Sequence, residues 1–300
     1  MTLELALTSL FGDSDITLAE NDLVKYGQDW TRFNNPNPIA VVFPRCSEQV
    51  QEIVRLARAE KWGLVPSGGR TGMSGGACAT NGEIVVSFEK MNKIIEFDSN
   101  DSIVTVEPGV ITGKLQDYAV EQGLYYPVDF GSSGSSHIGG NIASNAGGIR
   151  VIRYGMTRNW VSGLKVVTGA GDLLSLNNGL VKNNTGYDLR HLFIGSEGTL
   201  GFIVEASMKL TERPLDATVV VLAIPKMSDC LSVLKIFRES LVLNAFEFFS
   251  DNALEKVLSG MDIERPIKAS SAYYVLLEFE QKNADTLGVA ESAFSKCLSR

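Results

Sequence analysis

Val65-Pro-Ser-Gly-Gly-Arg-Thr-Gly-Met-Ser-Gly-Gly76 is the most glycine-dense segment of this 300-residue chain, and 25 of the 29 glycines lie between Gly63 and Gly201. A loop with so few side chains lets backbone N–H groups turn inward and lets a ligand lie directly on the main chain. The segment therefore predicts a loop that binds a pyrophosphate through its backbone.

Three known glycine motifs fit this segment poorly. A Walker A loop needs G-x-x-x-x-G-K-[ST], which this segment lacks. Elsewhere in the chain, Gly109-Val-Ile-Thr-Gly-Lys114 comes closer, but it has one residue too few between its glycines and Leu115 where a hydroxyl is needed. The dinucleotide fingerprint G-x-G-x-x-G does not occur here. Gly72-Met-Ser-Gly-Gly76 matches the nucleophile elbow G-x-S-x-G, but a loop and a predicted strand follow it instead of a helix. A purely structural glycine loop remains as an alternative.

Two further glycine-rich segments weaken that alternative. Gly131-Ser-Ser-Gly-Ser-Ser-His-Ile-Gly-Gly-Asn-Ile-Ala-Ser-Asn-Ala-Gly-Gly148 has only Ile138 and Ile142 as large apolar residues, and Ile194 to Ile203 repeats the pattern. Such a segment forms no core by itself, so we expect something to lie against it. Its hydroxyl and amide groups are suited to bind a bulky planar cofactor, and this interpretation is favoured over a flexible linker.

The chain changes character after Pro214. Before it, a helical segment of about 35 residues leads into alternating strands, helices and glycine loops, including a helix capped by Ser47. After it, glycine becomes rare, and a β-α-β…β-α order predicts a ferredoxin-like unit without its last strand, with Leu231, Leu234 and Phe237 on one helix face. We expect an α+β protein with domains at 1–35, 36–215 and 216–300, and a native chain that continues past Arg300.

Composition narrows the class of protein. The 27 basic and 35 acidic residues give a net charge of −8, which disfavours nucleic acid as a partner. The sequence shows neither an apolar run of ~20 residues nor a targeting peptide, so we expect a cytoplasmic protein. Four scattered cysteines and two histidines predict neither disulfides nor a metal site in this segment.

Six ordered motifs together resemble one family. They are Pro66–Gly72, His137–Ala143, Asn145–Gly148, Arg153–Gly155, Asn184–Leu189 and Phe193–Gly201. They look like the FAD-binding domain of the vanillyl-alcohol oxidase-type (PCMH-type) flavoproteins, over roughly residues 35–215. Within that family the chain is most similar to the FAD-dependent D-2-hydroxy acid dehydrogenases, and the run from Tyr126 to Gly155 is nearest to the D-2-hydroxyglutarate group.

The resemblance implies a set of FAD-binding residues. The first segment would wrap the pyrophosphate through its backbone, and the other two would line the ribityl, adenosine and adenine parts. The pyrophosphate residues would be Pro66, Ser67, Gly68, Gly69, Arg70, Thr71, Gly72, Met73 and Ser74. The remaining residues would be Gly131, Ser135, Ile138, Gly139, Gly140, Asn141, Ala143, Asn145, Ala146, Gly147, Gly198 and Ile203. Covalent-flavin relatives often have His where Arg70 stands, so Arg70 predicts a non-covalent FAD.

The resemblance also implies an activity. It implies oxidation of a D-2-hydroxy acid, D-2-hydroxyglutarate first, to the 2-oxo acid, with D-lactate or glycolate as alternative substrates and a non-catalytic FAD-carrying subunit as another alternative. The catalytic base and any divalent metal such as zinc would come from residues beyond Arg300. The electron acceptor would be an electron-transfer flavoprotein or a quinone, and a homodimer is possible in the family. We expect His137 to form hydrogen bonds near the cofactor loop, His191 to lie at the surface and Asp188 to pair locally.

Overall fold

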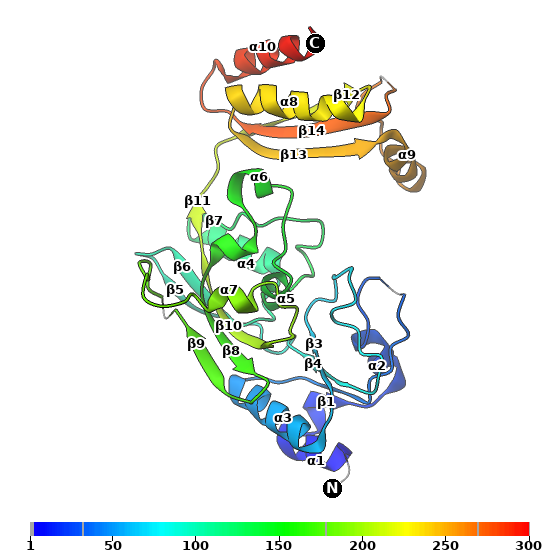
Figure 1. The fold of residues 1–300 in the computed structure, drawn as a ribbon, viewed down its shortest axis with the longest axis vertical. Helices are drawn as coiled ribbons and strands as arrows, with labels where there is room; N and C mark the ends of the chain where they lie inside the picture. The colour runs from blue at the N-terminus through cyan, green and yellow to red at the C-terminus, as the bar shows by residue number, and fades with distance from the viewer. Residues whose placement is uncertain (1–2, 32, 178, 269, 300) are drawn as a thin grey trace. The chain divides into compact units, whose positions relative to one another are not determined.

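The computed structural model describes residues 3–31, 33–177, 179–268 and 270–299 and forms two compact units (Figure 1). The first unit runs to Tyr126 and also contains Phe130–Ala146 and Met156–Thr211. The second consists of Pro127–Asp129, Gly147–Gly155 and the chain from Glu212 on. The second glycine-rich segment is therefore divided between the two units, and the domain boundaries expected at 35 and 215 stay predictions.

A small, mostly parallel sheet opens the first unit. Its strands are β1 (Ile16–Thr17), β2 (Ala40–Val42), β4 (Ile84–Ser87) and β3 (Leu64–Ser67), in that order. Strands β2, β4 and β3 run parallel, and the edge strand β1 is antiparallel to β2. The central strands β2 and β4 are fully buried, as expected from their mainly apolar sequences Ala-Val-Val and Ile-Val-Val-Ser. The first glycine segment leaves the carboxyl end of β3, the position where parallel sheets commonly bind ligands.

The second sheet of this unit is antiparallel. Its order is β5 (Ile94–Asp98), β6 (Ile103–Val106), β10 (Gly201–Lys209), β8 (Val161–Thr168) and β9 (Leu173–Leu176). One core joins the two sheets, because Ile53 and Val54 of helix α3 (Ser47–Glu60) belong to the same buried cluster as Phe202 of β10 and Val42 of β2. The other elements of the unit are α1 (Leu3–Phe11), η1 (Asp13–Asp15), α2 (Glu20–Tyr26), α4 (Thr112–Glu121), β7 (Leu124–Tyr125), α5 (Ile138–Ala143), η2 (Thr157–Trp160) and α7 (Arg190–Phe193).

The second unit contains a three-stranded antiparallel sheet. Its order is β12 (Ala217–Ile224), β14 (Tyr273–Glu280) and β13 (Leu243–Ser250), and β11 (Thr211–Glu212) precedes it in the chain. Figure 1 shows α8 (Met227–Ser240) and α10 (Thr286–Leu298) on one side of this sheet and α6 (Val151–Tyr154) on the other. Arg150 bonds Glu278 at 3.0 Å on that other side. Helix α9 (Asp251–Gly260) is capped by Ser250. The element order and sheet order match the predicted ferredoxin-like pattern.

Three local predictions are wrong. The first 35 residues are not only helical, because Ile16 and Thr17 form the edge strand β1. Ser47 is the first residue of α3, and Cys46 precedes it with no side-chain cap. Leu231 is exposed, because α8 turns Cys230, Val233, Ile236 and Phe237 toward the sheet instead. Apolar periodicity located α8 but not its rotation about its own axis.

The buried carboxylate of Asp15 stabilises the start of the first sheet. Asp15 lies just before β1, accepts a hydrogen bond from Arg45 at 2.9 Å and forms an ion pair with Lys90 at 2.7 Å. The bond from Arg45 is the main cause that lowers the pKa of Asp15 to about 2; burial opposes it and Lys90 adds to it. Because the pKa is depressed in the folded state, the stabilisation is present above pH ~4 and is lost as the pH falls toward 2.

Asp15→Asn should therefore lower the free energy of unfolding at pH 7 by about 1–3 kcal/mol, the range for hydrogen bonds to charged groups. The difference from wild type should shrink between pH 4 and pH 2. Urea unfolding at both ends of this range measures it, and Asp13→Asn, at an exposed position of the same 3-10 turn, is the matched control. Equal losses in the two variants would contradict the role of Asp15.

Candidate cofactor-binding site

The first glycine segment presents a row of backbone donors with no partner. Among the described residues, no amide from Gly68 to Ser74 donates a hydrogen bond. Seven consecutive unpaired N–H groups on a loop that follows a parallel strand are typical of a backbone anion site. These residues are half-buried or exposed, so the loop lies at the surface of the unit.

The three glycine-rich segments contact one another closely at glycines. A Cβ at Gly69 would overlap the carbonyl oxygen of Ser135, and a Cβ at Gly198 would overlap the ring of Pro66. The third segment is also bonded to α5, because the amides of Gly195 and Glu197 donate to the carbonyls of Ile142 and Ala143 at 3.0 and 2.9 Å. Segments that are far apart in the sequence therefore line one region, and glycine is required at Gly69 and Gly198, where they touch.

Each segment also holds one non-glycine residue in the left-handed region. The φ angles are +56° for Arg70, +47° for Asn145 and +50° for Glu197. Such conformations cost of order 1–3 kcal/mol and collect at functional sites, where the surrounding contacts enforce them. Each of the three segments therefore contains a tight turn at a non-glycine residue.

Two buried polar atoms beside the first segment lack a partner among the described residues. They are Oγ of Ser67 and Nδ1 of His137. A Cβ at Gly68 would lie 3.4 Å from Cβ of His137, so the imidazole lies against the start of the loop. Burial first, and Arg70 second, lower the pKa of His137 to about 4, so the ring is neutral at pH 7. The hydrogen bonds expected of His137 are not made by Nδ1 within the described chain.

The unpaired amides and the two buried polar atoms without a partner are groups that a polar cofactor would satisfy. A buried polar group without a hydrogen bond is costly, and a ligand that carries phosphate and ring-edge acceptors removes that cost. The donor set is backbone and hydroxyl, which suits a diphosphate and a sugar. The residues present therefore fit FAD.

The predicted residues of the second and third segments differ in what they offer. Asn141 is buried and donates to Thr112 Oγ1 at 2.6 Å, and a Cβ at Gly139 would lie 2.6 Å from Cβ of Pro108. Ile138 is fully buried, and Ile203 lies in β10 with its side chain in the core. The more accessible positions are Gly131, Ser135, Gly140, Ala143, Asn145, Ala146 and Gly198, and Gly147 belongs to the second unit.

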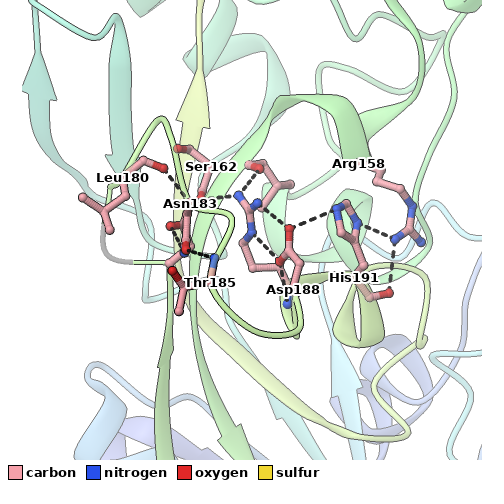
Figure 2. A network of polar contacts seen from close by, with 10 residues as sticks. Arg158, Ser162, Leu180, Asn183, Thr185, Asp188 and His191 are labelled. Carbon is pink, nitrogen blue, oxygen red and sulfur yellow. Dashed lines mark hydrogen bonds and ion pairs between the residues drawn. The ribbon is translucent and has the colours of Figure 1, made fainter.

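A network of polar side chains at residues 158 and 188–191 contacts the second glycine-rich segment (Figure 2). Nη1 of Arg158 lies 2.8 Å from Nδ1 of His191, whose Nε2 lies 3.4 Å from Asp188, and Arg190 bonds Asp188 at 2.6 Å. The amide of Arg158 donates to Oδ1 of Asn145 at 3.0 Å. Local pairing of Asp188 and the surface position of His191 are thus observed, and the network holds Asn145 in its unusual conformation.

Sequence reasoning missed the contacts that residues 26–31 make with the first segment. Oδ2 of Asp29 accepts the amide of Gly75 at 2.7 Å, and the amide of Trp30 donates to the carbonyl of Gly72 at 3.0 Å. The only local signal was the Asp29-Trp-Thr31 spacing of an Asx turn. That signal predicts a turn but not its partner.

No group of three or more His, Cys, Asp or Glu side chains in the described chain is placed to hold a metal ion. Within the same residues, every helix is too short or too polar to cross a membrane.

Replacing Gly69 tests whether the segments really touch there. Gly69→Ala should lower the free energy of unfolding by about 1–3 kcal/mol, the cost of overpacking, because the Ser135 carbonyl must move. Gly134→Ala is the control and should stay within about 0.5 kcal/mol, because a Cβ there meets nothing within 4 Å. Thermal or urea unfolding that fails to separate the two variants would contradict the contact.

Comparisons with known proteins agree with this geometry. Residues 38–177 match the family described as FAD binding domain. The D-2-hydroxyglutarate dehydrogenase of Stutzerimonas stutzeri (strain A1501) is 54% identical over 98% of this chain and 63% of its own length. The chain thus spans about three fifths of this relative. The resemblance to FAD-dependent D-2-hydroxy acid dehydrogenases that the motifs indicated is confirmed.

Solved structures show the same fold at low identity. An alkyldihydroxyacetonephosphate synthase superposes with a TM-score of 0.80 at 19% identity, over 100% of this chain and 60% of its own. A p-cresol methylhydroxylase with substrate bound superposes with a TM-score of 0.74 at 18% identity, over 97% and 63%. The predicted α+β fold of the PCMH type is confirmed, and residues 38–177 of this chain are similar to the FAD binding domain family.

Proposed function

We propose that this chain is the FAD-binding part of an enzyme that oxidises D-2-hydroxyglutarate to the 2-oxo acid. The observation that carries the proposal is the row of unpaired amides from Gly68 to Ser74. These amides offer an anion site within residues 38–177, the part of the chain that matches the FAD binding domain. The 54% identity to a D-2-hydroxyglutarate dehydrogenase supports the substrate. Because the chain spans only part of that relative, the activity is proposed for the whole protein.

The roles of individual residues are part of the proposal. Residues 66–74 would hold the pyrophosphate through their amides, with Ser67 Oγ as a further donor. The accessible backbone of the second segment would line the ribityl and adenosine groups, and Gly198 with the backbone of Ile203 would close the adenine side. For Ile138, Asn141 and Ile203 only main-chain atoms are proposed as contacts, because their side chains are occupied in packing or in a hydrogen bond.

The chain's own residues would bind and orient the cofactor. When bound, FAD would accept the hydride that leaves C2 of the hydroxy acid. Neutral His137 would supply one nitrogen for a hydrogen bond without adding a charge. Arg70, which has its guanidinium 4.5 Å from the Tyr26 ring centroid, cannot form the covalent flavin bond of a histidine, so FAD would stay dissociable.

Several finer points belong to the same proposal. D-lactate or glycolate remains the alternative substrate, and a non-catalytic FAD-carrying subunit is the alternative role. An electron-transfer flavoprotein or a quinone would accept the electrons. The proposal also includes a homodimer, a cytoplasmic location, and a divalent metal such as zinc bound by residues outside this chain.

The first prediction concerns the cofactor itself. The purified protein should bind FAD in a one-to-one ratio, and acid precipitation should release all of it into the supernatant, because no covalent bond forms at Arg70. Absorbance of the two fractions measures it. Flavin that remains with the precipitated polypeptide would contradict non-covalent binding, and a protein that neither contains nor takes up FAD would contradict the cofactor assignment.

The second prediction concerns the substrate. With the complete protein loaded with FAD and kept anaerobic, D-2-hydroxyglutarate should bleach the flavin absorbance faster than D-lactate, glycolate or L-2-hydroxyglutarate. Stopped-flow absorbance ranks the four acids. Faster bleaching by D-lactate or glycolate would transfer the assignment to that acid, and bleaching by none would favour the non-catalytic subunit.

A further inference from the structure

A short segment before the FAD-binding match contacts the first glycine segment at three points. The match begins at residue 38, and the contacts come from Tyr26, Asp29 and Trp30. The Tyr26 ring lies under the guanidinium of Arg70, Asp29 accepts the Gly75 amide, and the Trp30 amide donates to the Gly72 carbonyl. Two of these contacts lie within the row of unpaired amides, at Arg70 and Gly72, and the third lies directly after it, at Gly75.

The contacts fix which way the peptide planes face. In a trans peptide the carbonyl of one residue and the N–H of the next point in opposite directions. Because Trp30 holds the Gly72 carbonyl, the N–H of Met73 is directed away from residues 26–31. Arg70 Nη1 donates to the Gly68 carbonyl at 3.3 Å, so the N–H of Gly69 is likewise directed away from that guanidinium. The segment therefore orients donors that would otherwise be free to turn.

Asp29 is itself rigidly held. Its side chain is buried, and Oδ1 accepts from the amide and hydroxyl of Thr31 at 2.9 and 2.6 Å, while Oδ2 accepts from Gly75. Burial acts to raise the pKa of Asp29, but the bonds from Thr31, Gly75 and Cys78 outweigh it and keep the pKa below its ordinary value. Both oxygens are therefore acceptors in an ionised carboxylate.

Asparagine cannot replace this carboxylate. It has one acceptor oxygen and an NH₂ group, so either Thr31 or Gly75 would face a donor instead of an acceptor. An uncharged acceptor also forms a weaker bond than a carboxylate does. Because both carboxylate oxygens accept hydrogen bonds, this position requires aspartate.

We propose that Asp29 is a positioning residue, which holds the first glycine segment with the amides of Gly68–Ser74 presented to a diphosphate. This inference rests on the proposed FAD site and extends it to residues outside the matched domain. Asp29 touches no cofactor atom in this account; it acts through Gly75, and Trp30 acts through Gly72.

The test compares three variants of the protein without and with FAD. Asp29→Asn should increase hydrogen exchange of the Gly75 amide, which Asp29 binds, in the peptide that covers residues 68–76 of the FAD-free protein. It should also weaken FAD binding by roughly 10-fold or more, the loss expected for a charge-assisted hydrogen bond. Thr31→Val removes one donor and keeps the carboxylate, so it should give a smaller increase in the same peptide. Asp98→Asn is the control, because Asp98 also accepts an amide two residues ahead, from Asn100, but lies in β5.

Each outcome decides something. Exchange and affinity of Asp29→Asn equal to those of wild type would overturn the inference, as would equal changes in Asp98→Asn. Increased exchange in residues 68–76 while wild type itself binds no FAD would support the positioning of the loop and contradict the proposed function. If Asp29→Asn does not fold, the exchange of Thr31→Val decides, and an unchanged peptide 68–76 in that variant would overturn the inference.

Discussion

The structure depends on close contacts at two glycines. Gly69 lies against the carbonyl of Ser135, and Gly198 lies against the ring of Pro66. No residue with a Cβ fits either place without a shift of the neighbouring chain. Because these contacts bring three separate segments together, the unpaired amides, the neutral histidine and the strained residues lie in one region.

This region is costly without a ligand. Three non-glycine residues in the left-handed conformation and two orphaned buried polar atoms each raise the free energy of the folded chain. The core shared by the two sheets and α3 offsets that cost. A ligand that binds only the folded state adds stability in proportion to the logarithm of its concentration over its dissociation constant. FAD would thus stabilise the same region that it occupies.

Much of the fold follows from the sequence, because its signals are local. Glycine density located the loops, and the order of strands and helices after Pro214 predicted the ferredoxin-like pattern of the second unit. Other features depend on distant partners: Asp29 and Gly75 are 46 positions apart, and no spacing rule joins them. The rotation of α8, which leaves Leu231 exposed, and the inclusion of Gly147–Gly155 in the second unit likewise follow from tertiary packing.

The central claim is that the amides from Gly68 to Ser74 bind the diphosphate of FAD. Hydrogen exchange of these amides, measured on the protein with and without saturating FAD, tests it most directly. The account predicts strong slowing of exchange across residues 68–74 when FAD is present. Exchange in this segment that is as fast with FAD as without it, in a protein that demonstrably carries the cofactor, would contradict the claim.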